Sequence, residues 1–134
     1  MNKPPHILLI DDDPDDKLLF HEALVSVQSQ TCFNYFGNGR DAINWLSKTE
    51  ELPDYIFLDL NMPRMNGKET LEEIKKNPRL KPLPVIVYST SNNEIDKQEC
   101  KRLGAALYIT KPYRLADLKE VIVFAIKAVE PGYH

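Results

Sequence analysis

The fold is decided by Ile7–Pro14, a stretch that reads ILLIDDDP. Its four consecutive apolar residues predict a strand buried on both faces, as in a parallel sheet. Asp13 has the side chain of a helix N-cap, and Pro14 suits the first position of a helix. The stretch therefore predicts a buried strand that passes directly into a helix ending near Val27.

The same pattern of a short, buried-type strand followed by a helix recurs along the chain. Further strands are predicted at Cys32–Phe36, Tyr55–Leu58, Val85–Tyr88 and Ala106–Ile109, and further helices at Asp41–Ser47, Gly67–Lys76, Asn93–Leu103 and Leu115–Val129. Because hairpin signals are missing, helical crossovers must join the strands, and the sheet should be parallel. We expect one α/β domain over residues 1–134, with its core at about 5–129, built as an open, doubly wound sheet.

Composition narrows the class of protein. A length of 134 residues fits one domain, and 43% apolar residues are enough for a core. The formal net charge of −3 argues against direct nucleic-acid binding, which usually needs a basic face. No apolar run is long enough for a membrane span or a signal peptide, and Cys32 and Cys100 lack metal-ligand spacing. We therefore expect a cytoplasmic protein with reduced thiols and no membrane contact.

Polar residues follow the predicted strands at their C-terminal ends, where ligands bind in open α/β sheets. They are carboxylates, an amide, a hydroxyl and a lysine: Asp11, Asp12, Asp59, Asn61, Ser89 and Lys111. Three neighbouring carboxylates cannot all ionise without a counterion, and a few hard oxygen ligands suit Mg²⁺ or Mn²⁺. Asp59 can act as a nucleophile, and Lys111 can pair with a phosphate oxygen. The pattern predicts metal-dependent phosphoryl transfer onto a carboxylate.

Four segments resemble the signature blocks of bacterial response-regulator receiver domains. They read ILLIDDDP, FLDLNMPRMNG, VIVYSTS and YITKPY, at residues 7–14, 57–67, 85–91 and 108–113. The resemblance covers about Pro5–Val129 and implies the flavodoxin-like strand order 2-1-3-4-5 of chemotaxis receivers. It implies a phosphoacceptor in two-component signalling rather than a conventional enzyme. The long loop Asn77–Pro84 is similar to that of stand-alone receivers that partner phytochrome-type kinases.

On the metal side of the site, the resemblance assigns a role to four residues. Asp59 matches the phosphoacceptor, and it also matches a ligand of the metal ion. Asp12 matches a direct metal ligand and Asp11 a ligand that often acts through water. Asn61 matches the residue whose backbone carbonyl completes the metal site.

On the phosphoryl side, the resemblance assigns three more roles. Ser89, with Thr90 beside it as the alternative, matches the hydroxyl that follows the phosphoryl group. Lys111 matches the lysine that contacts phosphate, and the Lys111-Pro112 bond resembles a cis-proline bond that would aim it inward. Tyr108 matches the aromatic residue that turns inward after phosphorylation.

The resemblance also implies partners. A sensor histidine kinase or a phosphotransfer protein would supply the phosphoryl group, and a separate protein would receive the output. The output face would be formed by Asn93–Leu103, Ala106–Ile109 and Leu115–Val129. Phe124 lies on the polar side of the last helix, so this face also permits a homodimer. The segment Asn93–Leu103 has few apolar residues, which predicts low local stability.

Three alternatives stay open. A Mg²⁺-dependent phosphohydrolase with an aspartyl-phosphate intermediate would need a second acid two residues after Asp59, where Asn61 stands. A flavodoxin-like cofactor binder would need a phosphate-binding loop after the first strand, but the acidic Asp11–Asp16 segment would repel phosphate. A receiver-like scaffold that never cycles phosphate would share the fold without the chemistry.

Overall fold

The computed structural model describes residues 4–62 and 64–131. Five strands and five helices alternate over these residues. The strands are β1 (His6–Ile10), β2 (Cys32–Phe36), β3 (Tyr55–Leu58), β4 (Val85–Ser89) and β5 (Leu107–Thr110). The helices are α1 (Pro14–Val27), α2 (Gly39–Lys48), α3 (Gly67–Lys76), α4 (Glu94–Arg102) and α5 (Leu115–Ala128). The strands pair in parallel in the order β2-β1-β3-β4-β5, which confirms the predicted flavodoxin-like fold.

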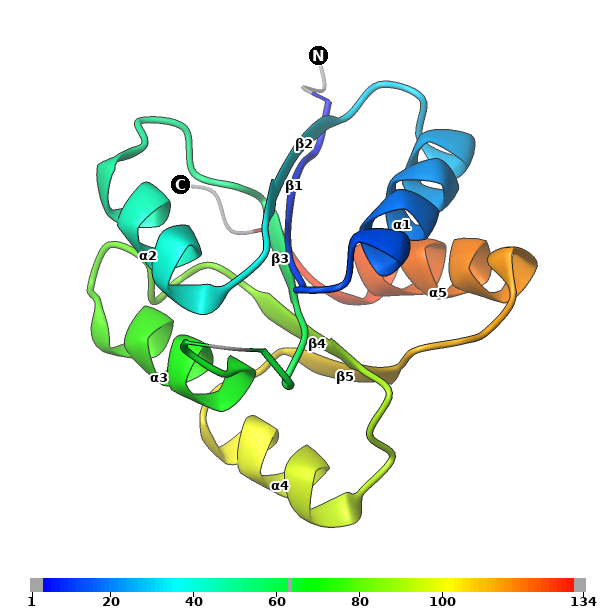
Figure 1. Ribbon diagram of the computed structural model, residues 1–134. Coiled ribbons are helices and arrows are strands. Elements are labelled where there is room, and N and C mark those ends of the chain that lie inside the picture. The colour runs from blue at the N-terminus through cyan, green and yellow to red at the C-terminus, as the bar shows by residue number, and fades with distance from the viewer. Residues whose placement is uncertain (1–3, 63, 132–134) are drawn as a thin grey trace.

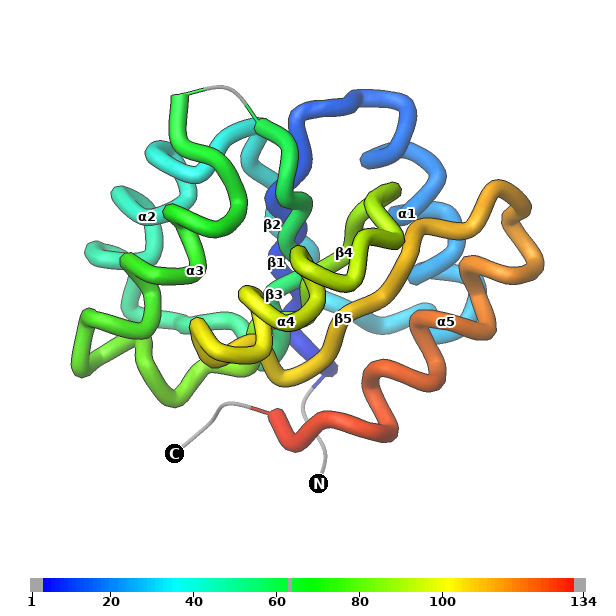
Figure 2. The backbone as a smooth tube through the Cα atoms, turned by 90° about the horizontal axis from the view of Figure 1, so that it is seen from below, coloured from blue at the N-terminus to red at the C-terminus, as the bar shows by residue number. Residues whose placement is uncertain are grey.

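Helices cover both faces of the sheet. Figure 1 shows α1 and α5 on one side and α2, α3 and α4 on the other, and Figure 2 shows the same layers from below. The side chains of each strand alternate between the two layers, so that Leu8 and Ile10 pack toward α2 and α3 while Ile7 and Leu9 pack toward α1 and α5. Because both faces are covered, every residue of β1 is buried, and Ile7–Ile10 form an unbroken apolar run within it.

The edge strands differ from the expectation that all five strands are fully buried. Cys32 of β2 is exposed and the other residues of that strand are only half-buried. In β5, Leu107 and Tyr108 are half-buried and Thr110 is exposed. Each of these strands has a neighbour on one side only, so the helices and the adjacent strand cover it incompletely.

Capping residues define the ends of several helices, although α2 begins at Gly39 with Asn38 as its N-cap, two residues before the predicted start at Asp41. The Asp13 carboxylate accepts a hydrogen bond of 2.9 Å from the backbone N–H of Asp15, and Pro14 is the first residue of α1. Asn66 and Glu69 form a reciprocal capping box at the start of α3. Gly104 follows α4 with a φ of 106°, a conformation that glycine adopts without strain. Among the described residues, no helix has the length and apolar character needed to cross a membrane.

Helix α4 is weakly anchored, as the sequence predicts. Cys100 is its one buried residue, and Ile95 is 65% exposed. A helix with so little buried apolar surface gains little stability from tertiary packing. This makes α4 the element of the sheet's α2–α3–α4 side that is most easily displaced.

Candidate functional site

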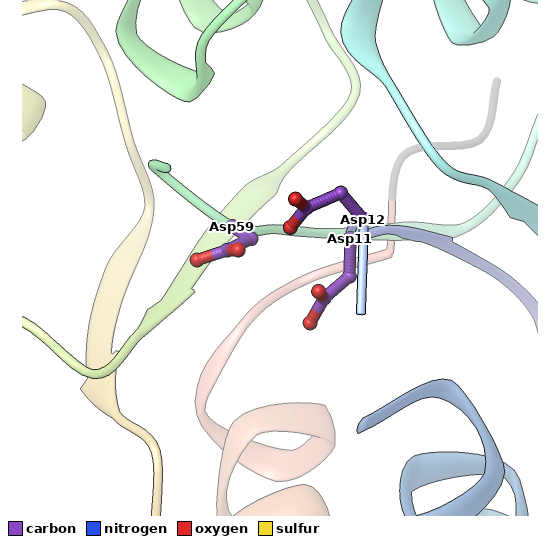
Figure 3. Close-up of side chains that lie close together, drawn as sticks. All are labelled: Asp11, Asp12 and Asp59. Carbon is purple, nitrogen blue, oxygen red and sulfur yellow. The ribbon is translucent and has the colours of Figure 1, made fainter. Parts of the chain in front are cut away.

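Three carboxylates meet at the C-terminal edge of the sheet. Asp11 and Asp12 follow β1, and Asp59 follows β3, its parallel neighbour. One carboxylate oxygen from each lies within 4.8 Å of the others, and Figure 3 shows the three side chains gathered where the two strands end. Asp11 and Asp59 are buried, whereas Asp12 is exposed. The cluster is therefore anchored in the protein and open to solvent on the side of Asp12.

A buried lysine supplies the positive charge of this site. The Lys111 ammonium Nζ lies 2.8 Å from Asp11 Oδ2, 2.7 Å from Asp16 Oδ2 and 3.7 Å from Asp59 Oδ2. It also lies 5.2 Å from the centre of the Tyr88 ring. Burial alone would lower the pKa of Lys111, but the hydrogen bonds to Asp11 and Asp16 and the nearby charges raise it above its usual value. Lys111 is therefore a permanent cation at neutral pH.

The prediction of a cis Lys111-Pro112 bond is wrong, since the described residues contain no cis peptide bond. The backbone N–H of Lys111 donates to the carbonyl of Ser89 at 2.7 Å, which continues the β4–β5 pairing beyond the end of β5. From this position the lysine side chain already reaches Asp11. A trans bond is therefore sufficient to bring the ammonium into the site.

The charges of the site are not balanced by Lys111. Burial raises the pKa of Asp59 to about 6, and the charge of Asp11 adds to this, although Lys111 and the backbone N–H groups of Asn61 and Leu60 act in the opposite direction. Burial also raises the pKa of Asp11. The ionised carboxylates therefore need further positive charge. A hard oxygen donor set of this kind fits a divalent cation such as Mg²⁺ or Mn²⁺.

Gly67, the first residue of α3, packs against the backbone of Asp59 and Leu60. The sequence indicated Gly67 only as the start of a helix. A Cβ atom on Gly67 would lie 2.3 Å from the Asp59 carbonyl oxygen and 2.5 Å from Leu60 Cα. The Gly67 N–H donates to the Leu60 carbonyl at 2.8 Å. Glycine at this position allows α3 to pack directly on the backbone of the acceptor residue. Asn61, in the same loop, is exposed, and the metal-binding role of its carbonyl stays a prediction.

Ser89 and Tyr108 are joined through Ser91, a connection that the sequence did not reveal. Ser89 is fully buried at the end of β4, whereas Thr90 is exposed. The Ser91 N–H donates to Ser89 Oγ at 3.1 Å, and the Tyr108 hydroxyl donates to the Ser91 carbonyl at 2.9 Å. The Ser91 hydroxyl in turn donates to Asp96 Oδ2 at 2.6 Å. A change at Ser89 therefore acts on the residue that holds both Tyr108 and the first turn of α4.

An ion-pair cluster continues this connection from α4 to α3. Lys68 Nζ lies 2.7 Å from Asp96 Oδ1 and 3.2 Å from Glu99 Oε1. The hydrogen bond from Lys68, followed by that from Ser91, lowers the pKa of Asp96, so the acid stays ionised. The β4–α4 loop, α4 and α3 thus share one polar network on the surface beside the site.

Asp16 is a site residue that the sequence did not reveal, and its carboxylate pairs with Lys111. It was part of an acidic helix start, and nothing in the spacing indicated a pair with a lysine 95 positions later. Its position on the first turn of α1, next to the acids of β1, is the one signal that places it near the cluster.

Comparison with known proteins decides the family. The sequence matches the family model for the response regulator receiver domain over residues 7–123. The chain belongs to this family. Response regulator Rcp1 of Synechocystis sp. is 36% identical to the chain over 126 residues, which is 90% of this chain and 86% of Rcp1.

Solved receiver domains have the same architecture. The phosphorylated cyanobacterial phytochrome response regulator RcpA superposes with a TM-score of 0.88 and 32% identity, covering 97% of this chain and 99% of RcpA. The Mn²⁺-bound form of Rcp1 superposes with a TM-score of 0.85 and 33% identity, covering 97% of this chain and 100% of that one. The receiver domain described here is thus similar to a cyanobacterial phytochrome response regulator and to a response regulator that has been crystallised with Mn²⁺.

Proposed function

We propose that this receiver domain accepts a phosphoryl group on Asp59 from a histidine kinase in the presence of Mg²⁺. The observation that carries the proposal is the position of Asp59. Its carboxylate is buried at the end of β3, within 4.8 Å of oxygens of Asp11 and Asp12 and 3.7 Å from the Lys111 ammonium. This combination offers a nucleophile, a site for a hard cation and a fixed positive charge for a phosphate oxygen.

In the proposed step, a carboxylate oxygen of Asp59 attacks the phosphorus of a phosphohistidine. A new P–O bond forms as the P–N bond breaks, and the electron pair of that bond returns to the imidazole. The step needs no general base, because an ionised carboxylate carries no proton to remove. Lys111 is positioned to pair with a phosphoryl oxygen, and Ser89 offers a hydroxyl donor on the neighbouring strand.

Asp11, Asp12 and Asp59, with the backbone carbonyl of Asn61, would hold the divalent cation. Bound there, Mg²⁺ supplies positive charge that lets Asp59 stay ionised and that neutralises the phosphoryl oxygens during transfer. Burial, and to a smaller extent the charge of a neighbouring aspartate, raises the pKa of both Asp59 and Asp11, and a bound cation would offset the cost of ionising them. Mn²⁺ suits the same donors.

The phosphorylated state would then alter the face formed by α4, β5 and α5. When the Ser89 hydroxyl turns to the phosphoryl group, the Ser91 N–H loses its acceptor, and the loop that holds Tyr108 and Asp96 is free to rearrange. Tyr108 would move toward the space that the hydroxyl leaves. The weak anchoring of α4 supports a shift of this element, since little buried surface resists it.

We further propose a phytochrome-type kinase as the phosphoryl donor and an output protein or a second copy as the partner of the switched face. The similarity to a phytochrome response regulator supports the first, and the 58% exposure of Phe124 on α5 supports the second. Transfer from purified phytochrome-type and other kinases tests the donor. Gel filtration with and without a phosphoryl mimic, for the wild type and Phe124→Ala, tests self-association.

The first experiment is the intact mass of the protein after incubation with acetyl phosphate and Mg²⁺. We expect a gain of one phosphoryl group that is lost in Asp59→Asn and in the presence of a chelator. Asp54→Asn, at the opposite end of β3, is the matched control and should keep the gain. Wild-type protein that is folded, holds Mg²⁺ and gains no phosphoryl group from acetyl phosphate or from kinases would refute the proposal in favour of a non-cycling scaffold. Rapid turnover of generic phosphate esters would instead favour a phosphohydrolase.

A further inference from the structure

The shortest ion pair of Lys111 is with Asp16, an acid on α1 to which the proposed phosphoryl chemistry gives no part. The Nζ–Oδ2 distances are 2.7 Å to Asp16, 2.8 Å to Asp11 and 3.7 Å to Asp59. The ammonium therefore forms hydrogen bonds to two acids on the β1–α1 side of the site and lies beyond hydrogen-bond distance of Asp59.

We propose that Asp16 is a positioning residue that holds Lys111 in its unphosphorylated-state position and so opposes the phosphorylated state. The inference rests on the proposed function, because it gives Lys111 a phosphoryl oxygen as its later partner. Lys111 has three N–H donors, of which one is directed to Asp11 and one to Asp16. The Asp16 carboxylate turns one donor away from Asp59 and neutralises part of the charge that a phosphoryl group would attract.

Burial decides which of the two bonds gives way on phosphorylation. The Asp11 side chain is 0% exposed, so losing Lys111 would leave a buried carboxylate without a partner. The Asp16 side chain is 32% exposed, and water can solvate it once the lysine moves. The Lys111–Asp16 pair is therefore the contact that opens, while Asp11 keeps the ammonium in the site.

The test is the affinity of the protein for fluoroberyllate, a non-covalent phosphoryl mimic, at saturating Mg²⁺. We expect Asp16→Asn to bind the mimic about fivefold more tightly than the wild type, the size of effect of one partly exposed charged hydrogen bond. Asp15→Asn removes the same charge from the same turn, where the side chain is exposed, and should stay within about twofold. Asp16→Glu keeps a carboxylate and should restore wild-type affinity.

A second measurement, the affinity for Mg²⁺ without the mimic, tests whether Asp16 acts through Lys111. Without Asp16 the lysine pairs with Asp11 alone and its charge opposes the cation, so Asp16→Asn should weaken Mg²⁺ binding more than Asp15→Asn does. In a Lys111→Ala background the two substitutions should have equal effects. Equal effects of both substitutions with Lys111 present, or an Asp16 effect that persists without it, would overturn the inference. Failure of the wild type to bind the mimic, with Mg²⁺ bound, would instead count against the proposed function.

Discussion

Replacing Asp59 by asparagine should stabilise the metal-free protein at neutral pH. The pKa of Asp59 rises from 3.8 to about 6 in the folded protein, chiefly through burial. A difference of about two pH units corresponds to roughly 3 kcal/mol, the free energy by which the ionised carboxylate disfavours the fold at pH 7. Asparagine has the same shape and no charge, so we expect Asp59→Asn to raise the free energy of unfolding by about 1–3 kcal/mol.

The stabilising effect of Asp59→Asn should depend on pH. The folded state of the wild type binds the Asp59 proton more tightly than the unfolded state does. Its stabilising effect is complete below about pH 4 and is lost as the pH rises through about 6. The asparagine variant has no such proton to lose. The difference in stability between the two proteins should therefore be small near pH 4 and should reach its full value above pH 6.

Urea unfolding in the presence of a chelator, at a series of pH values, measures the effect. Asp15→Asn serves as the control, since this exposed acid should change the stability by less than about 0.5 kcal/mol. Saturating Mg²⁺ should recover stability in the wild type and much less in Asp59→Asn, because bound cation stabilises the folded state by mass action. A metal-free Asp59→Asn protein that is less stable than the wild type at pH 7 would refute the claim that the buried, ionised Asp59 destabilises the folded protein.

Two further substitutions test the support of the site and its connection to α4. Gly67→Ala would place a methyl group against the Asp59 backbone. We expect it to lower the free energy of unfolding in urea by about 1–3 kcal/mol and to slow phosphorylation. Gly37→Ala, whose methyl group would lie no closer than 3.6 Å to its nearest neighbour, should change neither quantity. Lys68→Ala removes the ion pairs between α3 and α4 and should lower the protection of α4 amides from hydrogen exchange, with a change in global stability below about 1 kcal/mol. Lys76→Ala, whose ion pair lies within α3, should leave the protection of α4 unchanged. Equal exchange of the α4 amides in both variants would show that the Lys68 ion pairs do not stabilise α4.

The sequence predicted the strands and the acids well because both depend on local patterns. Each buried strand is an apolar run, and the acids stand directly at the strand ends. Once the strands are parallel, the side chains that follow them must meet at one edge, which is why Asp11 and Asp59 could be paired without coordinates. The start of α1 was equally predictable, because a cap such as Asp13 binds a backbone group two residues away. The start of α2 was predicted two residues late, because Asn38 and Gly39 are residues that are also common in turns.

The contacts that sequence reasoning missed depend on side-chain reach between distant elements. Asp16 meets a lysine 95 positions away, and Ser91 links three elements through its N–H, carbonyl and hydroxyl groups at once. Aspartate at a helix start and serine in a loop usually cap backbone groups, so neither residue type indicates a long-range contact. The wrong prediction of a cis Lys111-Pro112 bond has a different origin, since it rested on the family resemblance alone.

The same charge imbalance would explain why the proposed site responds to a metal ion and to a phosphoryl group. The Lys111 ammonium lies within 3.7 Å of carboxylate oxygens of Asp11, Asp16 and Asp59, and Asp12 adds a further acid beside Asp11 and Asp59. If the site binds a divalent cation as proposed, the cation offsets the negative charge and makes an ionised Asp59 available as a nucleophile. A neutral, well-paired site would be more stable, but it would have less to gain from the metal and less reason to rearrange when a phosphoryl group arrives. Under the proposed function, the raised pKa of Asp59 and the competition of Asp16 for Lys111 would act together, so that the unphosphorylated state is held by ion pairs that exchange when the phosphoryl group arrives.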